Sequence, residues 1–228
     1  MKIFVTGTDT GVGKTIISVG LLKALEQLNP AWATLGLKPI ASGADRIKDS
    51  FYNDDALSLQ AAASKKVPYS VVNPFVFETA IAPHIAARQG GSELRLNAVV
   101  DALSDTFQNF SADVYIIEGA GGWHVPLNDH ELYSDVVKTL QLPVILVVGM
   151  KLGCLNHSLL TENAILSSGV PLIGWIANMM DPHMSAYAEN LSTLRACLKS
   201  PCLGIVPYGG NAMEHIDLRS FEGLLERT

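Results

Sequence analysis

The segment Gly7-Thr8-Asp9-Thr10-Gly11-Val12-Gly13-Lys14-Thr15 constrains the fold of this 228-residue chain more than any other feature. It follows the phosphate-binding pattern, in which a glycine, a variable stretch and Gly-Lys-Thr succeed one another, but five residues separate Gly7 from Gly13 where that pattern has four. In such loops the backbone N–H groups face phosphate oxygens, the lysine reaches the outer phosphates, and the threonine hydroxyl binds Mg²⁺. The segment therefore predicts a nucleoside triphosphate site.

The residues on either side of this loop supply the elements that the pattern requires. Residues 1–6 form a short apolar run rich in β-formers, which predicts a buried strand. Residues 16–28 carry apolar side chains at helical spacing, and Asn29-Pro30 ends the pattern. A strand, a glycine-rich loop and a helix N-terminus then follow one another, which is an anion-binding geometry. These flanks disfavour the alternative of a glycine-rich turn that precedes Lys-Thr by chance.

Strand-like and helix-like segments alternate along the rest of the chain. Further strands are predicted at residues 33–40, 114–117, 143–148, 172–177 and 203–206, and helices at 56–63, 96–107, 134–140, 158–167 and 185–198. Residues 43–53 and 64–80 are interpreted as loops. The alternation predicts an α/β fold: a single P-loop NTPase-like domain over residues 1–228, with a parallel sheet and helices on both faces. Ligands of such sheets bind beyond the carboxyl ends of the strands.

Composition excludes several classes of protein. The chain is 48% hydrophobic and 17% charged, so it can bury a substantial core. Its net charge of -6, without a Lys/Arg-rich run, argues against nucleic acid as a partner. Its three cysteines and six histidines show no metal-ligand spacing, and no apolar stretch has the length of a membrane helix. With a strand expected from the second residue there is no room for a signal peptide, and we expect a soluble, cytoplasmic protein.

Two charged residues follow predicted strands. Lys38 ends the strand at 33–40 and is a candidate second cation beside the phosphate site, with a surface lysine as the alternative. Glu118 ends the strand at 114–117, where a P-loop protein carries the acid that organises Mg²⁺. That acid is usually Asp, and the alternative for Glu118 is a solvated side chain in a tight turn. The small residues after it, Gly119, Ala120 and Gly121, permit close backbone approach to a ligand.

Other candidates remain open on the residues alone. Asn53-Asp54-Asp55 begins a helix, which Asn53 or Asp54 is expected to cap, and Asp55 is a candidate metal ligand. The N-terminus of the helix that follows residues 149–157 is a candidate carboxylate site, and Cys154 in that segment is interpreted as a packing residue because no basic partner is evident. Asn178 could hydrogen-bond a base edge. His84 is interpreted as part of a helix start, with a site role possible.

Six segments, taken together, resemble the dethiobiotin synthetase family of ATP-dependent ligases. The resemblance spans nearly the whole chain, and it is carried by the loop at 7–15, Lys38-Pro39-Ile40-Ala41-Ser42-Gly43, Asn53-Asp54-Asp55-Ala56-Leu57, Ala82-Pro83-His84, Glu118-Gly119-Ala120-Gly121-Gly122-Trp123, and Lys151-Leu152-Gly153-Cys154-Leu155-Asn156-His157. The last two are the most specific. The resemblance implies carboxylation of 7,8-diaminopelargonate with CO₂, phosphorylation of the carbamate by ATP, and closure of a cyclic urea, in biotin biosynthesis.

The resemblance also implies roles for individual residues. Lys14 and Lys38 would be catalytic, and Thr15, Asp55 and Glu118 would hold Mg²⁺, which selects Asp55 over Asp54. Thr10 and Ser42 would contact the carbamate or the amines. The enzyme would be a homodimer with its active site at the interface, where the partner's Gly153, Cys154 and Asn156 bind the substrate carboxylate. The nucleotide would be bound by Gly11, Val12, Gly13, Lys14, Thr15, Ile16, Asp55, Glu118, Gly119, Ala120, Gly121, Asn178, Pro207, Tyr208 and Gly209.

One position departs from the family, and two other functions compete. Gly11 stands where some members carry Glu. A ParA/MinD-like regulatory ATPase is the main alternative, although Thr8, Asp9 and Thr10 occupy the stretch where those proteins carry a second lysine. A regulatory domain that binds nucleotide without catalysis is a third hypothesis, disfavoured by the intact Lys38 and Glu118 segments. The C-terminal segment after Gly210 predicts little.

Overall fold

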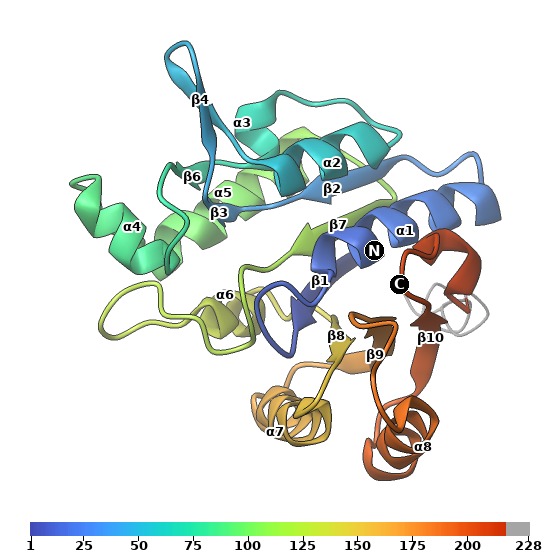
Figure 1. Cartoon of the computed structure of the whole chain (residues 1–228). Helices are drawn as coiled ribbons and strands as arrows, with labels where there is room; N and C mark the ends of the chain where they lie inside the picture. The colour runs from blue at the N-terminus through green and yellow to red at the C-terminus, as the bar shows by residue number, and fades with distance from the viewer. Residues whose placement is uncertain (218–228) are drawn as a thin grey trace.

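A six-stranded parallel sheet forms the centre of the computed structural model, which describes residues 1–217 (Figure 1). Its neighbouring strands all pair in parallel. Their order is β10 (Cys202–Val206), β9 (Leu172–Met179), β8 (Val144–Met150), β1 (Lys2–Gly7), β7 (Val114–Glu118) and β2 (Thr34–Leu37). The predicted α/β fold with a parallel sheet is thus confirmed.

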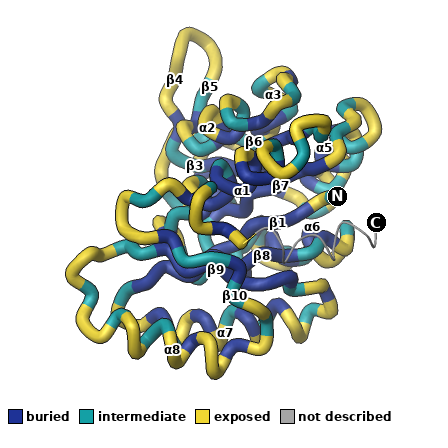
Figure 2. The backbone as a smooth tube through the Cα atoms, turned by 90° about the vertical axis from the view of Figure 1, so that its right-hand side faces the viewer, coloured by how far each residue is buried: buried dark blue, intermediate teal, exposed yellow. Residues whose placement is uncertain are grey.

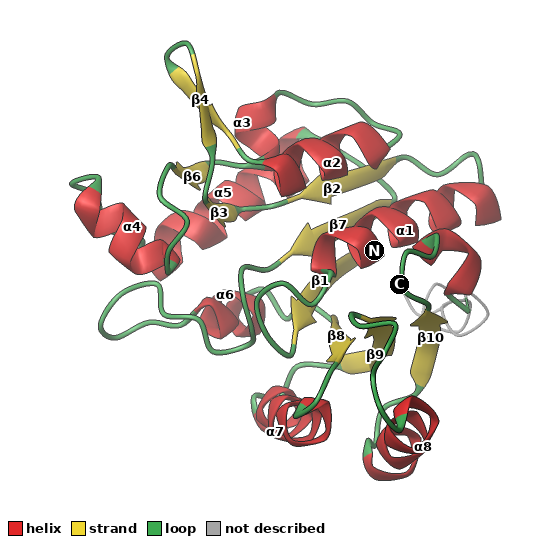
Figure 3. Ribbon diagram, in the orientation of Figure 1, coloured by secondary structure: helices red, strands yellow, loops and turns green. Residues whose placement is uncertain are grey.

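Helices cover both faces of this sheet (Figure 3). One face packs against α1 (Lys14–Leu28), α2 (Asp54–Ala62) and the 3₁₀ helix η1 (Ala212–His215). The other face packs against α5 (Leu96–Asn109), α6 (Tyr133–Thr139), α7 (Cys154–Ser167) and α8 (Tyr187–Cys197). Alternate residues of each strand pack into the apolar cores on opposite faces of the sheet: in β1, Ile3 and Val5 face α1, whereas Phe4 faces α6. Burial on both faces explains why these strands are almost uniformly apolar (Figure 2).

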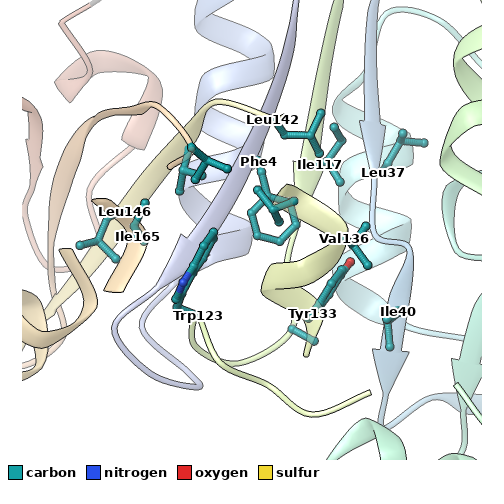
Figure 4. Close-up of a cluster of buried hydrophobic side chains, with 14 of the residues drawn as sticks. Phe4, Leu37, Ile40, Ile117, Trp123, Tyr133, Val136, Leu142, Leu146 and Ile165 are labelled. Atoms are coloured by element: carbon teal, nitrogen blue, oxygen red, sulfur yellow. The ribbon is translucent and has the colours of Figure 1, made fainter. Parts of the chain in front are cut away.

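An aromatic cluster fixes the segment that leaves β7. The ring of Phe4 meets Tyr133 edge-on at 5.5 Å and Trp123 at 6.5 Å between centroids (Figure 4). All three side chains are buried. Because Phe4 lies on β1 and Trp123 ends the glycine-rich segment after Glu118, this packing holds that segment against the strand that carries the phosphate-binding loop.

The second predicted strand is divided in the structure. β2 ends at Leu37, and β3 (Ile40–Ser42) pairs with β6 (Phe75–Phe77) in a separate two-stranded sheet. Pro39 has no N–H to donate to a neighbouring strand, and the N–H of Lys38 donates to the carbonyl of Val72. The strand is therefore interrupted at Lys38 and Pro39. Lys38 consequently lies at the end of β2.

The two predicted loops contain regular structure, so those predictions were wrong. Within 43–53, β4 (Asp45–Ile47) and β5 (Ser50–Tyr52) form a hairpin that projects from the fold (Figure 1). Within 64–80 lie β6 and the one-turn helix α3 (Tyr69–Val72), and α4 (Pro83–Gln89) follows. The helix predicted from residue 158 begins earlier, at Cys154, after Gly153 in a left-handed conformation with φ 95°.

Candidate active site

A cavity of about 320 Å³ lies at the carboxyl ends of β1, β2 and β7. Polar and charged side chains from separate parts of the sequence meet there, because parallel strands end at one edge of the sheet. Twelve of the predicted site residues line it: Thr10, Gly11, Gly13, Lys14, Thr15, Ile16, Lys38, Ser42, Asp55, Glu118, Ala120 and Gly121.

The backbone of the phosphate-binding loop requires glycine at two of its positions. Gly11 and Gly13 have φ values of 71° and 85°, in the left-handed region that side chains disfavour. A Cβ on Gly13 would lie 2.1 Å from Nδ2 of Asn178, whereas one on Gly11 would meet nothing within 4 Å. Helix α1 begins directly after Gly13, so its first N–H groups face the cavity side of the loop.

Three contacts hold this loop on the ends of neighbouring strands. The side chain of Asn178, near the end of β9, donates to the carbonyl of Val12 at 2.9 Å. The N–H of Thr8 donates to the carbonyl of Val147 in β8 at 3.0 Å. Nζ of Lys151 pairs with Oδ2 of Asp9 at 2.9 Å. The loop, with its additional residue, is therefore tied to both β8 and β9.

Lys14 is buried at the first position of α1. Its Nζ donates to the carbonyl of Asp9 at 3.2 Å. Burial, reinforced by the charge of Lys38, lowers the pKa of Lys14 to about 8, while Glu118 and Asp55 oppose the shift. The ammonium of Lys14 therefore gains much by pairing with an anion in the cavity.

Lys38 lies between two carboxylates. Its Nζ is 2.5 Å from Oε1 of Glu118, 3.0 Å from Oδ2 of Asp55 and 3.3 Å from the carbonyl of Gly119. Burial disfavours the ammonium, but the two carboxylates outweigh it and raise the pKa of Lys38 above its usual value. Burial likewise opposes ionisation of Asp55, yet Lys38 and Thr15 hold the pKa of Asp55 below its usual range. Neither Lys38 nor Glu118 is solvated, so both alternative interpretations from the sequence were wrong.

Oxygen donors that suit Mg²⁺ converge beside this lysine. The hydroxyl of Thr15 donates to Oε1 of Glu118 at 3.0 Å, and Thr15 also helps to lower the pKa of Asp55. The second oxygen of Glu118, Oε2, is buried without a partner. Within residues 1–217 no cluster of three or more His, Cys, Asp or Glu side chains could hold a metal by itself. The set fits a hard cation that takes further oxygens from phosphate and water, as Mg²⁺ does.

The structure distinguishes the roles of the adjacent residues Asn53, Asp54 and Asp55. Oδ1 of Asn53 accepts from the N–H of Ala56 and caps α2, while its Nδ2 donates to the carbonyl of Gly43. Asp54 is exposed, and Asp55 points to Lys38. Of these three residues, Asp55 is therefore the one whose side chain pairs with Lys38.

Other predicted residues lie outside the cavity lining. Gly153, Cys154 and Asn156 form the start of α7, with Cys154 buried and Asn156 on the outer surface. Pro207, Tyr208 and Gly209 form an exposed turn after β10. That turn precedes Gly210, which lines a neighbouring cavity of about 470 Å³ together with Thr15 and Ile16.

Sequence reasoning missed the pair of Asp9 and Lys151 and the place of Asn53 in the cavity wall. Lys151 directly follows β8, so the same strand-end rule that selected Lys38 could have selected it. Among the described residues, no helix combines the length and the apolar composition needed to cross a bilayer.

The fold and the loop define a class, the P-loop nucleotide-binding proteins. A family model described as an AAA domain matches residues 1–215. The MinC:MinD cell division protein complex of Aquifex aeolicus is similar in structure, with a TM-score of 0.55 at 13% identity over 100% of this chain and 96% of that one. A ParA family ATPase of Chlorobium tepidum gives 0.51 at 14% identity over 93% and 91%. At these identities the likeness shows the fold alone.

Curated relatives define the family within this class. The ATP-dependent dethiobiotin synthetase of Chromohalobacter salexigens is 47% identical, over 90% of this chain and 88% of its own length. Those of Marinobacter nauticus and Pseudomonas paraeruginosa are 45% and 47% identical, over 98% and 95% of this chain and 93% and 96% of their own lengths. The chain belongs to the dethiobiotin synthetase family.

Proposed function

We propose that this chain is an ATP-dependent dethiobiotin synthetase, a ligase of biotin biosynthesis. One amine of 7,8-diaminopelargonate takes up CO₂ as a carbamate, and a carbamate oxygen attacks the γ-phosphorus of ATP with departure of ADP. The second amine then attacks the carbamoyl carbon and phosphate leaves, which closes the cyclic urea of dethiobiotin. The observation that carries the proposal is the meeting of Lys14, Lys38, Thr15, Asp55 and Glu118 at one cavity in a member of this family.

The phosphates of ATP would lie on the loop at residues 7–15. Backbone N–H groups and the N-terminus of α1 provide a positive electrostatic environment for them. Nζ of Lys14 would exchange the carbonyl of Asp9 for phosphate oxygens. Phosphoryl transfer depends on such positioning and charge neutralisation more than on covalent help from the protein.

Thr15, Asp55 and Glu118 would hold the Mg²⁺. The ion supplies neutralisation of charge on the transferring phosphate. Support comes from the chemistry of the donor set, a hydroxyl and two carboxylates, and from the partnerless Oε2 of Glu118.

The acceptor would be arranged by Lys38, Thr10 and Ser42. Lys38 carries a charge on this side of the cavity, which suits it to the carbamate oxygens and the transferring phosphate. The hydroxyls of Thr10 and Ser42 face the same cavity and can hydrogen-bond the carbamate or the amines.

The nucleoside would lie beside Asn178 and the turn at 207–209. Because Nδ2 of Asn178 is bound to the carbonyl of Val12, its Oδ1 is the group that would accept from an amine on the base. The backbone of Gly119, Ala120 and Gly121 would border the bound ATP. The adjoining cavity of about 470 Å³ gives room for a base and ribose.

We expect a homodimer in which α7 of each subunit completes the other's site. Exposed leucines lie on α7 and just before it: Leu160 is 62% exposed, Leu159 and Leu166 are also exposed, and Leu152, which precedes the helix, is 98% exposed. Several exposed apolar side chains on one element are typical of protein interfaces. Gly153, Cys154 and Asn156 adjoin these leucines, so a partner docked on them would receive their N–H groups for its substrate carboxylate. We also regard residues 1–228 as one domain, since both apolar cores share one sheet.

The test is phosphate release with and without the diamine. Purified protein with ATP, Mg²⁺ and bicarbonate should release phosphate only when 7,8-diaminopelargonate is added, with dethiobiotin formed in equal amount. Hydrolysis that ignores the diamine and responds to DNA or lipid vesicles would favour a ParA/MinD-like ATPase instead.

A further inference from the structure

Lys38 pairs with the two carboxylates that also form the proposed metal site. Its Nζ contacts Oε1 of Glu118, Oδ2 of Asp55 and the carbonyl of Gly119. The hydroxyl of Thr15 converges on the same Oε1. One ammonium thus pairs with both carboxylates that the proposed function gives to Mg²⁺, while Oε2 of Glu118 has no hydrogen-bond partner.

Glu118 requires a cation at all times. It has no exposed surface, and an unpaired carboxylate at such depth is strongly unfavourable. Lys38, itself only 5% exposed, meets that requirement. When a divalent cation binds the two carboxylates, Glu118 has two cations beside it. The ammonium and the metal then repel one another, and solvent screens this repulsion least at the buried Glu118.

We infer that Lys38 and the divalent cation exchange at Glu118 and Asp55, so that metal loading releases the Lys38 ammonium toward the phosphoryl acceptor. The released side chain loses its carboxylate partners, and it is buried too deeply to be solvated where it stands. Its remaining favourable partners are anionic oxygens in the cavity, those of the γ-phosphate and the carbamate. Lys38 therefore stays on the carboxylates until the metal and its nucleotide are bound.

This inference rests on the proposed function for the identity of the acceptor, but the exchange itself can be measured without the diamine. The first measurement is Mn²⁺ binding followed by electron paramagnetic resonance, with saturating ADP present. Lys38→Met should bind Mn²⁺ at least tenfold more tightly than the wild type, because no ammonium has to be displaced. Lys138→Met serves as the control, since Lys138 pairs with Asp135 on α6 and lines neither the cavity nor the loop at 7–15; its Mn²⁺ affinity should stay within about twofold of wild type. Equal or weaker binding by Lys38→Met would contradict the exchange.

The second measurement follows the ammonium itself in the wild-type protein. In lysine labelled with ¹⁵N, the Lys38 ammonium signal is identified by its absence from Lys38→Arg, which retains a cation beside Glu118. That signal should shift when Mg²⁺ and a non-hydrolysable ATP analogue are added, and should return when the metal is chelated. A signal that ignores Mg²⁺ would show that Lys38 remains on the carboxylates, with the metal held by the other oxygen of Glu118, and would overturn the inference. If the wild-type protein shows no diamine-dependent turnover, the proposed function is contradicted, whereas the exchange of Lys38 with the metal is not.

Discussion

The side-chain amide of Asn178 donates to the backbone carbonyl of Val12 at 2.9 Å, so a residue near the end of β9 holds the phosphate-binding loop in place. Asn178→Ala should therefore lower the free energy of unfolding by about 1–3 kcal/mol, because the buried carbonyl loses its donor. Nucleotide affinity should fall about tenfold or more as the loop loosens. Denaturant unfolding and calorimetric titration check the two effects. Asn97→Ala, an exposed position on α5, should leave both unchanged; unchanged stability in Asn178→Ala would restrict Asn178 to a ligand contact.

Gly13→Ala should abolish nucleotide binding. Its φ of 85° disfavours any side chain, and the added Cβ would lie 2.1 Å from Nδ2 of Asn178. The control is Gly91→Ala, where φ is 73° and a Cβ meets nothing within 4 Å, so only backbone strain of about 1 kcal/mol is expected. Fluorescent nucleotide binding measures the difference. Tight binding by Gly13→Ala would mean that the loop tolerates a different backbone.

Nucleotide binding should weaken as pH rises above about 8. Since the pKa of Lys14 is lowered to about 8, Lys14 loses its charge in the free protein above that pH, and phosphate binding must then restore the proton. The dissociation constant should rise by up to about tenfold for each pH unit. Calorimetry in buffers of different ionisation enthalpy should detect proton uptake.

The lowered pKa of Lys14 also determines how the stability of the fold changes with pH. Between pH 8 and the usual lysine pKa of 10.5, the unfolded chain holds a proton on Lys14 that the folded chain has lost. The contribution of Lys14 to stability therefore rises with pH across that window and is absent below it. Lys14→Arg keeps its charge throughout, so a pH profile as steep in Lys14→Arg as in the wild type would assign the effect to another group.

Lys38→Ala should retain nucleotide binding and lose turnover. It also leaves the buried Glu118 without its cation, which should cost about 3–5 kcal/mol of stability. The double variant Lys38→Met/Glu118→Gln removes both charges and should recover much of that stability, but no turnover. Thermal unfolding and the diamine-dependent phosphate assay separate the two effects. Turnover in Lys38→Ala would remove Lys38 from the catalytic group.

Leu160→Glu should convert the proposed dimer to a monomer and abolish turnover, because a charge would enter the apolar surface of α7. Leu28→Glu is matched to it, as an exposed leucine at the end of α1 on a different surface. Sedimentation measures the assembly, and the phosphate assay measures turnover. A Leu160→Glu protein that is monomeric and fully active would place the whole active site within one chain.

Much of the sheet and of the site was predictable because buried strands appear in the sequence as apolar runs, and site residues follow the ends of those runs. The strand at 144–150 is apolar throughout, and the strand at 114–118 is apolar up to its final residue, Glu118; Lys38 directly follows β2. The hairpin β4–β5 could not be recognised in this way, because its short strands are largely exposed and their residues do not alternate between buried and exposed. Nor does local sequence indicate that Ile40–Ser42 pairs with Phe75–Phe77, a partner more than thirty residues away.

The partners of site residues were less predictable than the residues themselves. The sequence placed Lys38 near phosphate, but its contacts with Asp55 and Glu118 depend on how α2 and β7 are positioned by the fold. The pairing of Asp9 with Lys151 joins positions more than a hundred residues apart. Capping of α2 by Asn53 follows local rules and was foreseen, whereas the inward direction of Asp55 was not fixed by the residues alone.

Strand β1, which leads into the phosphate-binding loop, is an inner strand with β8 on one side and β7 on the other. Its amide protons are consequently shielded by two ladders and by helices on both faces. Hydrogen exchange at β1 should require opening of the whole sheet, whereas the edge strands β10 and β2 can exchange by local fraying. Loss of β1 on heating should then coincide with global unfolding, so the strand that carries the phosphate-binding loop stays in place until the sheet itself opens.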